Sequence, residues 1–89
     1  MKNFSELVRG DKVLVKTIDK GQLVKEEMVR CQYVEHVTKC WDGQYSVLIL
    51  EKSYLPNDYK NDIIVNSDLW YAHVSYSNDG YVVISTNIE

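Results

Sequence analysis

Two cysteines and two histidines are the residues best suited to nucleophilic or metal chemistry in this chain: Cys31, His36, Cys40 and His73. A cysteine nucleophile needs its sulfur within hydrogen-bond reach of a histidine nitrogen. Cys31 and His36 lie five positions apart, so an unbroken strand places them on opposite faces and only a bulge would bring them together. Zinc sites favour cysteines separated by two to four residues, whereas eight residues separate Cys31 from Cys40. We therefore expect no catalytic residues, no metal and no other cofactor.

Aromatic side chains are the stronger functional signal, because they make up 11% of the chain and seven of the ten are tyrosines. Tyrosine combines a large rigid contact area with a polar tip and is enriched at interfaces. The candidate binding surface joins a tryptophan beside a turn, part of a long polar loop and the polar face of a later strand: Trp41, Tyr54, Asp58, Tyr59, Tyr71 and His73. The alternative is that these residues only pack the loop onto the domain. Four other aromatic residues are expected inside: Phe4, Tyr33, Tyr45 and Trp70.

The distribution of charge limits the class of partner. The net charge is −3, of which residues 1–40 carry +2 and residues 41–89 carry −5. A nucleic-acid binder normally needs a basic stripe to neutralise phosphates, and the second half of the chain cannot supply one. The first half carries an alternative basic surface around its first hairpin: Lys12, Lys16, Lys20, Lys25 and Arg30. Such charges usually form a solvated face that guards an edge strand, although they also suit single-stranded nucleic acid stacked on tyrosines.

The length of 89 residues suits one domain, which we expect to span residues 1–89. No apolar stretch approaches the roughly 20 residues that cross a bilayer, and the N-terminus shows no apolar signal-peptide segment. We therefore expect a cytoplasmic protein with no membrane partner. The cysteine content agrees, because secreted domains of this size usually carry two or more disulfides, and we expect Cys31 and Cys40 to be free thiols.

Short strands and turns must position these side chains. The pattern predicts a helical turn at residues 4–8 and strands over residues 12–18, 23–40, 44–52, 63–65, 69–76 and 81–86. Asp42-Gly43 is the strongest hairpin signal. Val29, Cys31 and Tyr33 share one parity, whereas Val34, Thr38 and Cys40 take the other, and this change of phase predicts a bulge or bend within the long second strand. The third strand is apolar on both parities, which favours a central position.

The predicted fold is therefore mainly β: a small antiparallel barrel or roll of five to six strands with one short N-terminal helical turn. Residues 7–15 read LVRGDKVLV. This opening resembles the first strand of Src-homology-3-like and Tudor-like barrels, including those with the ribosome-associated KOW motif. The resemblance covers only these residues, and it implies the barrel fold and a function in binding.

The function that these observations favour is a non-catalytic interaction module that docks a protein partner through an aromatic, acidic surface. The acidic second half would steer it towards a basic surface. Small size and acidity also suit an accessory or inhibitor protein of a phage or mobile element.

Two other functions stay open. One is an oligomeric protein that sequesters a small ligand, such as a nucleotide or a sugar, in a pocket of aromatics with Arg9, Arg30 or a lysine. The homo-oligomer would pair the apolar strand at residues 81–86 across a dyad. The other is nucleic-acid binding through the basic first hairpin, which the charge distribution makes the less favoured function.

Overall fold

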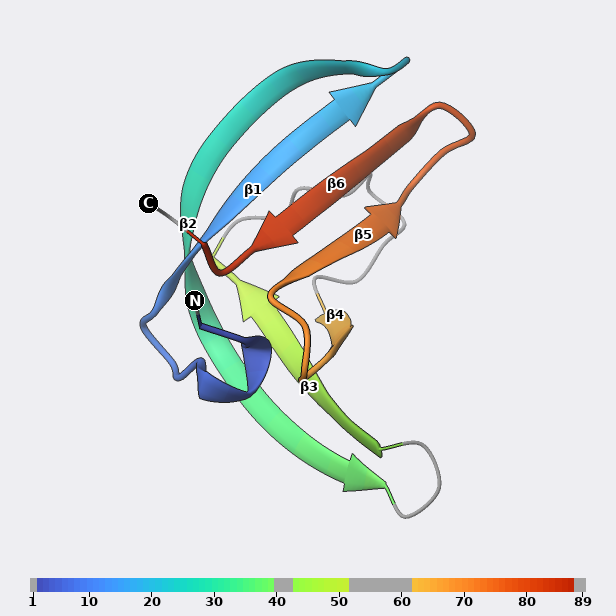
Figure 1. Ribbon diagram of the computed structural model, residues 1–89. Helices are drawn as coiled ribbons and strands as arrows, with labels where there is room; N and C mark the ends of the chain where they lie inside the picture. Colours follow the sequence, from blue (N-terminus) through green and yellow to red (C-terminus); the bar gives the residue numbers. More distant parts are fainter. Residues whose placement is uncertain (1, 40–42, 52–61, 88–89) are drawn as a thin grey trace.

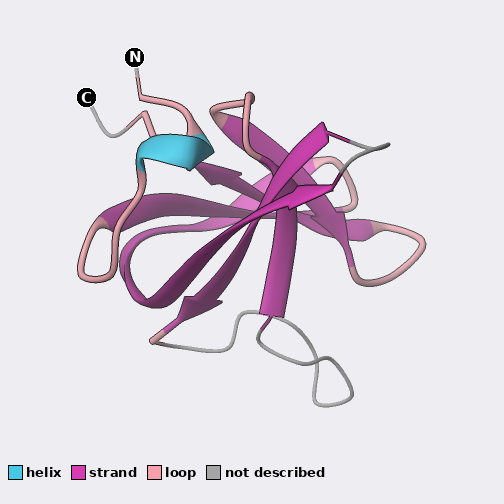
Figure 2. Ribbon diagram, turned by 90° about the horizontal axis from the view of Figure 1, so that it is seen from below, coloured by secondary structure: helices cyan, strands magenta, loops and turns pink. Residues whose placement is uncertain are grey.

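The computed structural model describes residues 2–39, 43–51 and 62–87. One 3-10 turn and six antiparallel strands follow in chain order: η1 (Phe4–Glu6), β1 (Lys12–Asp19), β2 (Gln22–Lys39), β3 (Gly43–Leu50), β4 (Asp62–Asn66), β5 (Tyr71–Ser75) and β6 (Gly80–Ser85). The strands are ordered β4-β3-β2-β1-β6-β5 and curl into a nearly closed barrel (Figure 1). The turned view shows the strands crossing around a common interior, with η1 at the periphery (Figure 2). The mainly β barrel predicted from the sequence is confirmed.

The long strand β2 serves both halves of the barrel. Its first part, as far as Arg30, pairs with β1, and its second part, from Cys31 onwards, pairs with β3. The register with β3 shifts between Cys31 and Tyr33, so that Gln32 has no partner. A bulge in this strand was predicted from the change of phase between Tyr33 and Val34, and the structure places it slightly earlier, at Gln32. A bulge bends its strand and increases the local twist. Figure 1 accordingly shows β2 as one curved ribbon that passes from the side of β1 to the side of β3.

Three backbone hydrogen bonds fix this turning point. The amide of Cys31 donates to the carbonyl of Asp11 at 2.7 Å, and the amide of Gly10 donates to the carbonyl of Cys31 at 2.9 Å. The amide of Glu51 donates to the carbonyl of Arg30 at 3.1 Å. Gly10 has a φ of +96°, a conformation that glycine adopts without steric cost. The chain before β1 and the chain after β3 are thus tied to β2 where it changes partner.

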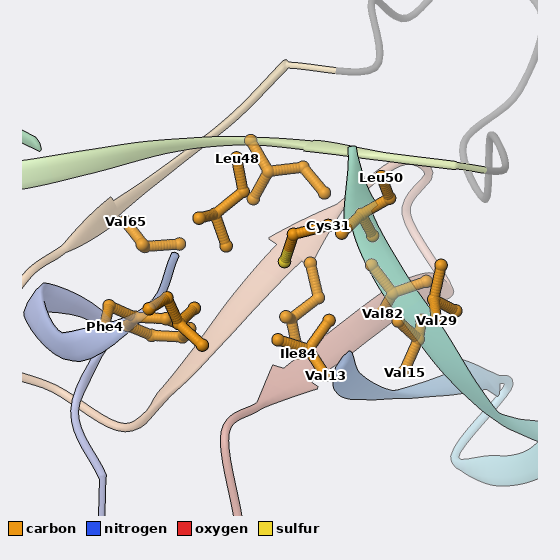
Figure 3. Close-up of a cluster of buried hydrophobic side chains, with 12 residues drawn as sticks. Phe4, Val13, Val15, Val29, Cys31, Leu48, Leu50, Val65, Val82 and Ile84 are labelled. Atoms are coloured by element: carbon orange, nitrogen blue, oxygen red, sulfur yellow. The ribbon is translucent and has the colours of Figure 1, made fainter. Parts of the chain in front are cut away.

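The core lies between the two halves of the barrel (Figure 3). It contains apolar side chains from η1, from the residue that follows η1 and from every strand except β5: Phe4, Leu7, Val13, Val15, Val29, Cys31, Leu48, Leu50, Ile63, Val65, Val82 and Ile84. Phe4 was expected there and is fully buried, and its amide donates to the carbonyl of Leu69 at 2.9 Å. The segment before β1 therefore closes one part of the barrel with an aromatic side chain.

Two aromatic residues expected in the core lie outside it. Tyr33 is 45% exposed, because the bulge brings it opposite Ile49 and makes Val34 the inward residue. Trp70 is 38% exposed because it precedes β5, whose packing against the core begins at Ala72. Tyr45 is half-buried.

The last strand is also placed differently from the expectation. β6 pairs with β1 on one side and with β5 on the other, so residues 81–86 offer no free edge for pairing across a dyad. The edges of the described sheet are β4 and β5. Within the described residues, no helix is long and apolar enough to cross a membrane.

The role of Phe4 can be tested by truncation. We expect Phe4→Ala to lower the free energy of unfolding by about 3 kcal/mol or more, because it leaves a cavity in a small core. Val8→Ala is the control, since Val8 lies in the same segment but is 62% exposed, and it should change stability by less than about 0.5 kcal/mol. Urea unfolding measures both. Equal effects of the two substitutions would contradict the assignment of η1 to the core.

Candidate functional site

The outer face of β2, β1, β6 and β5 is built by side chains that point away from the core. Because neighbours in a strand alternate between faces, the buried residues of β1 and β6 force the residues between them outwards. The strand registers arrange these outward residues in two rows: Met28, Leu14, Ser85 and Tyr71 in one, and Glu26, Lys16, Val83 and His73 in the next. The face therefore combines apolar, aromatic and charged side chains from four strands.

A groove of about 600 Å³ lies on this outer face. The residues that determine its chemistry are Leu14, Lys16, Glu26, Trp70, Tyr71 and Val83. Leu14 in β1 and Val83 in β6 supply apolar surface. Lys16 and Glu26 are cross-strand partners of opposite charge. A second hollow of about 400 Å³ lies at Arg9, Gln32, Tyr33 and Ile49.

Four rings form a continuous aromatic strip beside the groove: Trp70, Tyr71, His73 and Tyr81. The ring centroids of Trp70 and Tyr71 are 4.9 Å apart and meet edge to face, as do those of Tyr71 and His73 at 6.0 Å. His73 stacks on Tyr81 with a centroid separation of 5.1 Å and an interplanar angle of 8°. These ring contacts favour the observed rotamers of the four side chains over others.

The aromatic strip contains two of the six residues predicted for the binding surface. Tyr71 and His73 lie side by side on the outer face of β5, as their strand parity predicted. The other four, Trp41, Tyr54, Asp58 and Tyr59, lie outside the described residues.

Sequence reasoning missed Trp70 and Tyr81 as members of this surface. The turn at Asn78-Asp79-Gly80 held a signal for Tyr81, because it sets the hairpin register that pairs Ser75 with Tyr81. The ring of His73 is then the diagonal neighbour of Tyr81 on the same face. Trp70 had no comparable local signal.

The alternative basic surface is divided by the fold. Lys12, Lys16 and Arg30 have outward register positions, whereas Lys25 lies on the opposite parity and forms an ion pair with Glu27 at 3.2 Å. Arg30 donates to the carbonyl of Gly10 at 3.0 Å and lies 3.7 Å from the carboxylate of Glu51. Lys16 is opposite Glu26, and Lys20 is in the turn after β1. The five basic residues therefore do not form one uninterrupted positive surface.

The cysteine–histidine pair considered above does not form. In the register set by the bulge, His36 lies opposite the buried Ser46. Both ring nitrogens of His36 have partners other than Cys31: Nδ1 forms a hydrogen bond with the Ser46 hydroxyl at 2.7 Å, and Nε2 forms one with the Leu7 carbonyl at 2.9 Å. The Ser46 hydroxyl also bonds to that of Ser67 at 2.9 Å. This network connects β2, β3 and the turn after β4 to the segment before β1, and both serines are buried. We interpret it as structural.

Cys31 is a buried free thiol. Burial raises its pKa to about 11, and the nearby carboxylate of Asp11 contributes in the same direction. The protonated thiol is a poor nucleophile and a poor metal ligand. Among the residues that the structure describes, no group of three or more His, Cys, Asp or Glu side chains is placed to hold a metal ion.

Comparison of this chain with protein-family models, with curated proteins and with solved structures finds no match. The chemistry of the groove and the aromatic strip therefore carries the functional argument.

The environment of Cys31 predicts its reactivity. With a pKa of about 11, only about one thiol in a thousand is ionised at pH 8, and burial blocks access to it as well. We expect iodoacetamide to label Cys31 at least about 100-fold more slowly in the native protein than in 8 M urea. Peptide mapping by mass spectrometry follows this site separately from Cys40. Native labelling at the rate of a free thiol would show that Cys31 is exposed.

Proposed function

We propose that this protein is a non-catalytic interaction module that binds a segment of a protein partner on the outer face of β1, β6 and β5. The observation that carries the proposal is the aromatic strip beside the groove of about 600 Å³. Tryptophan and tyrosine are the residues that most often anchor protein interfaces. Because the rings already pack against one another, binding would cost little side-chain entropy.

The groove suits a peptide that offers one apolar side chain with polar neighbours. Leu14 and Val83 provide apolar surface to receive such a side chain. Lys16 and Glu26 provide opposite charges that would pair with polar or charged groups of the segment. Since these two charges balance within the groove, attraction of a basic partner would come from the wider acidic second half of the chain.

Two observations weigh against the other functions. A protein that sequesters a small ligand usually encloses most of the ligand's surface, whereas this groove lies on the outer face of a sheet. A nucleic-acid groove requires positive charge along the backbone path. Here Lys16 is opposite Glu26, and Lys25 is paired with Glu27.

Selection from a random peptide library tests the proposal and requires no candidate partner. A phage-displayed library of random 12-residue peptides is panned against the protein, and the selected peptides are measured by fluorescence polarisation. We expect Trp70→Ala and Tyr71→Ala each to weaken binding by at least about tenfold, because both remove an anchor of the groove. Tyr33→Ala is the matched control, since Tyr33 is slightly more exposed than Trp70 and Tyr71 but lies in the second hollow.

The outcomes separate the candidate functions. Loss of binding in Trp70→Ala and Tyr71→Ala but not in Tyr33→Ala supports the proposed site. Unchanged binding in the first two variants, or loss only in Tyr33→Ala, overturns it. If no peptide is selected and a 12-nucleotide oligomer of deoxythymidine binds at 20 mM salt, the partner is a nucleic acid and the proposal fails. Thermal melting of each variant confirms that the fold is kept.

A further inference from the structure

The tryptophan that lines the groove lies just before β5, and two backbone hydrogen bonds fix its position. The carbonyl of Trp70 accepts from the amide of Thr86 at 2.9 Å. The carbonyl of the preceding residue, Leu69, accepts from the amide of Phe4, also at 2.9 Å. The backbone at Trp70 is therefore held by the residue that follows β6 and by the start of the chain, residues 2–5, which we call the N-terminal segment.

Thr86 connects the N-terminal segment directly to this wall of the groove. Its hydroxyl donates to the carbonyl of Lys2 and lies 3.3 Å from the carbonyl of Trp70. The two neighbours of Thr86, Ser85 and Asn87, line the groove, whereas the side chain of Thr86 is only 7% exposed. One buried hydroxyl thus ties the first residues of the chain to the strand end that forms part of the groove.

The N-terminal segment has fixed points of its own, away from the groove. The ring of Phe4 is fully buried in the core. The amide of Ser5 donates to the carbonyl of Ser67 at 3.0 Å, and the ammonium group of Lys2 lies 2.8 Å from the carboxylate of Asp11. Figure 1 shows this segment beside the end of β6. The segment can therefore position the groove wall, because it is itself held by the core.

We propose that the N-terminal segment holds Trp70 in the orientation that binds the partner, and that Thr86 is the positioning residue. This inference rests on the proposed function, in which Trp70 is an anchor. The ring of Trp70 is 38% exposed and meets that of Tyr71 at 4.9 Å, so its position depends largely on its backbone. Release of the segment would free that backbone, and binding would then cost more conformational entropy. The affinity of the groove thus depends on residues outside its lining.

NMR of the free protein tests the positioning without any ligand. Thr86→Val keeps the shape of the side chain and the backbone amide but removes the hydroxyl donor. We expect the indole N–H signal of Trp70 to shift and its heteronuclear NOE to fall, because the ring gains motion on the ps–ns timescale. The signal is distinguished from that of Trp41 by its absence in Trp70→Ala.

Two matched variants separate positioning from a general effect of the substitution. Thr86→Ser restores the hydroxyl and should restore the wild-type signal of Trp70. Thr38→Val makes the same change at an exposed position of β2 and should leave that signal unchanged. An unchanged Trp70 signal in Thr86→Val, or the same change in Thr86→Ser or Thr38→Val, would overturn the inference.

Hydrogen exchange of the wild-type protein gives a second test that needs no variant. If the segment and the groove wall open together, the amides of Phe4 and Thr86 should have protection factors within about threefold of each other, because their acceptors are the adjacent carbonyls of Leu69 and Trp70. A Phe4 amide at least about tenfold less protected than that of Thr86 would show that the segment opens while the groove wall stays in place.

Affinity for a peptide selected from the library then links the positioning to binding. We expect Thr86→Val to weaken binding at least about fivefold, and Thr86→Ser and Thr38→Val to change it less than twofold. In the Trp70→Ala background, Thr86→Val should have no further effect, because it acts through Trp70. Wild-type affinity in Thr86→Val overturns the inference and leaves the proposed groove intact. If no peptide is selected, the proposed function fails, and the NMR comparison alone decides whether Thr86 positions Trp70.

Discussion

The barrel depends on one turning point, where β2 changes its partner from β1 to β3. Cys31 lies at this point, with its side chain in the core and its backbone bonded to Gly10 and Asp11. The bulge at Gln32 changes the inward parity of β2. Without the extra residue of this bulge, one part of β2 would direct its apolar side chains towards solvent. The unbroken strand can therefore serve both halves of one core only because it is bent here.

The aromatic surface is a consequence of the same geometry. In the half made by β1, β6 and β5, the residues of β1 and β6 that enter the core are valines and one isoleucine. Tyr71, His73 and Tyr81 occupy outward positions and pack on one another instead. Exposed rings that form a contiguous patch usually mark an interaction site, whereas scattered ones do not. This contrast separates the aromatic strip from Tyr33, which is exposed but makes no ring contact with another residue that the structure describes.

Alternation and turn signals were sufficient to predict the strands, and each observed boundary lies within two residues of the expected one. The change of phase between Tyr33 and Val34 was sufficient to predict a bulge in β2, although not its position at Gln32, which moves Tyr33 out of the core. Local signals could not place Trp70, because its position depends on distant contacts: its carbonyl accepts from Thr86, and that of the preceding Leu69 accepts from Phe4. The order of strands in the sheet, which decides whether β6 or β5 forms an edge, is likewise set by long-range pairing.

The most direct test of the central claim is an NMR titration of the isotope-labelled protein with a selected peptide. If the groove beside the aromatic strip is the binding site, the largest shift changes will occur at the indole N–H of Trp70, at Tyr71 and at the methyl groups of Val83. Largest changes at Arg9, Gln32 and Ile49 would instead place binding in the second hollow and contradict the account.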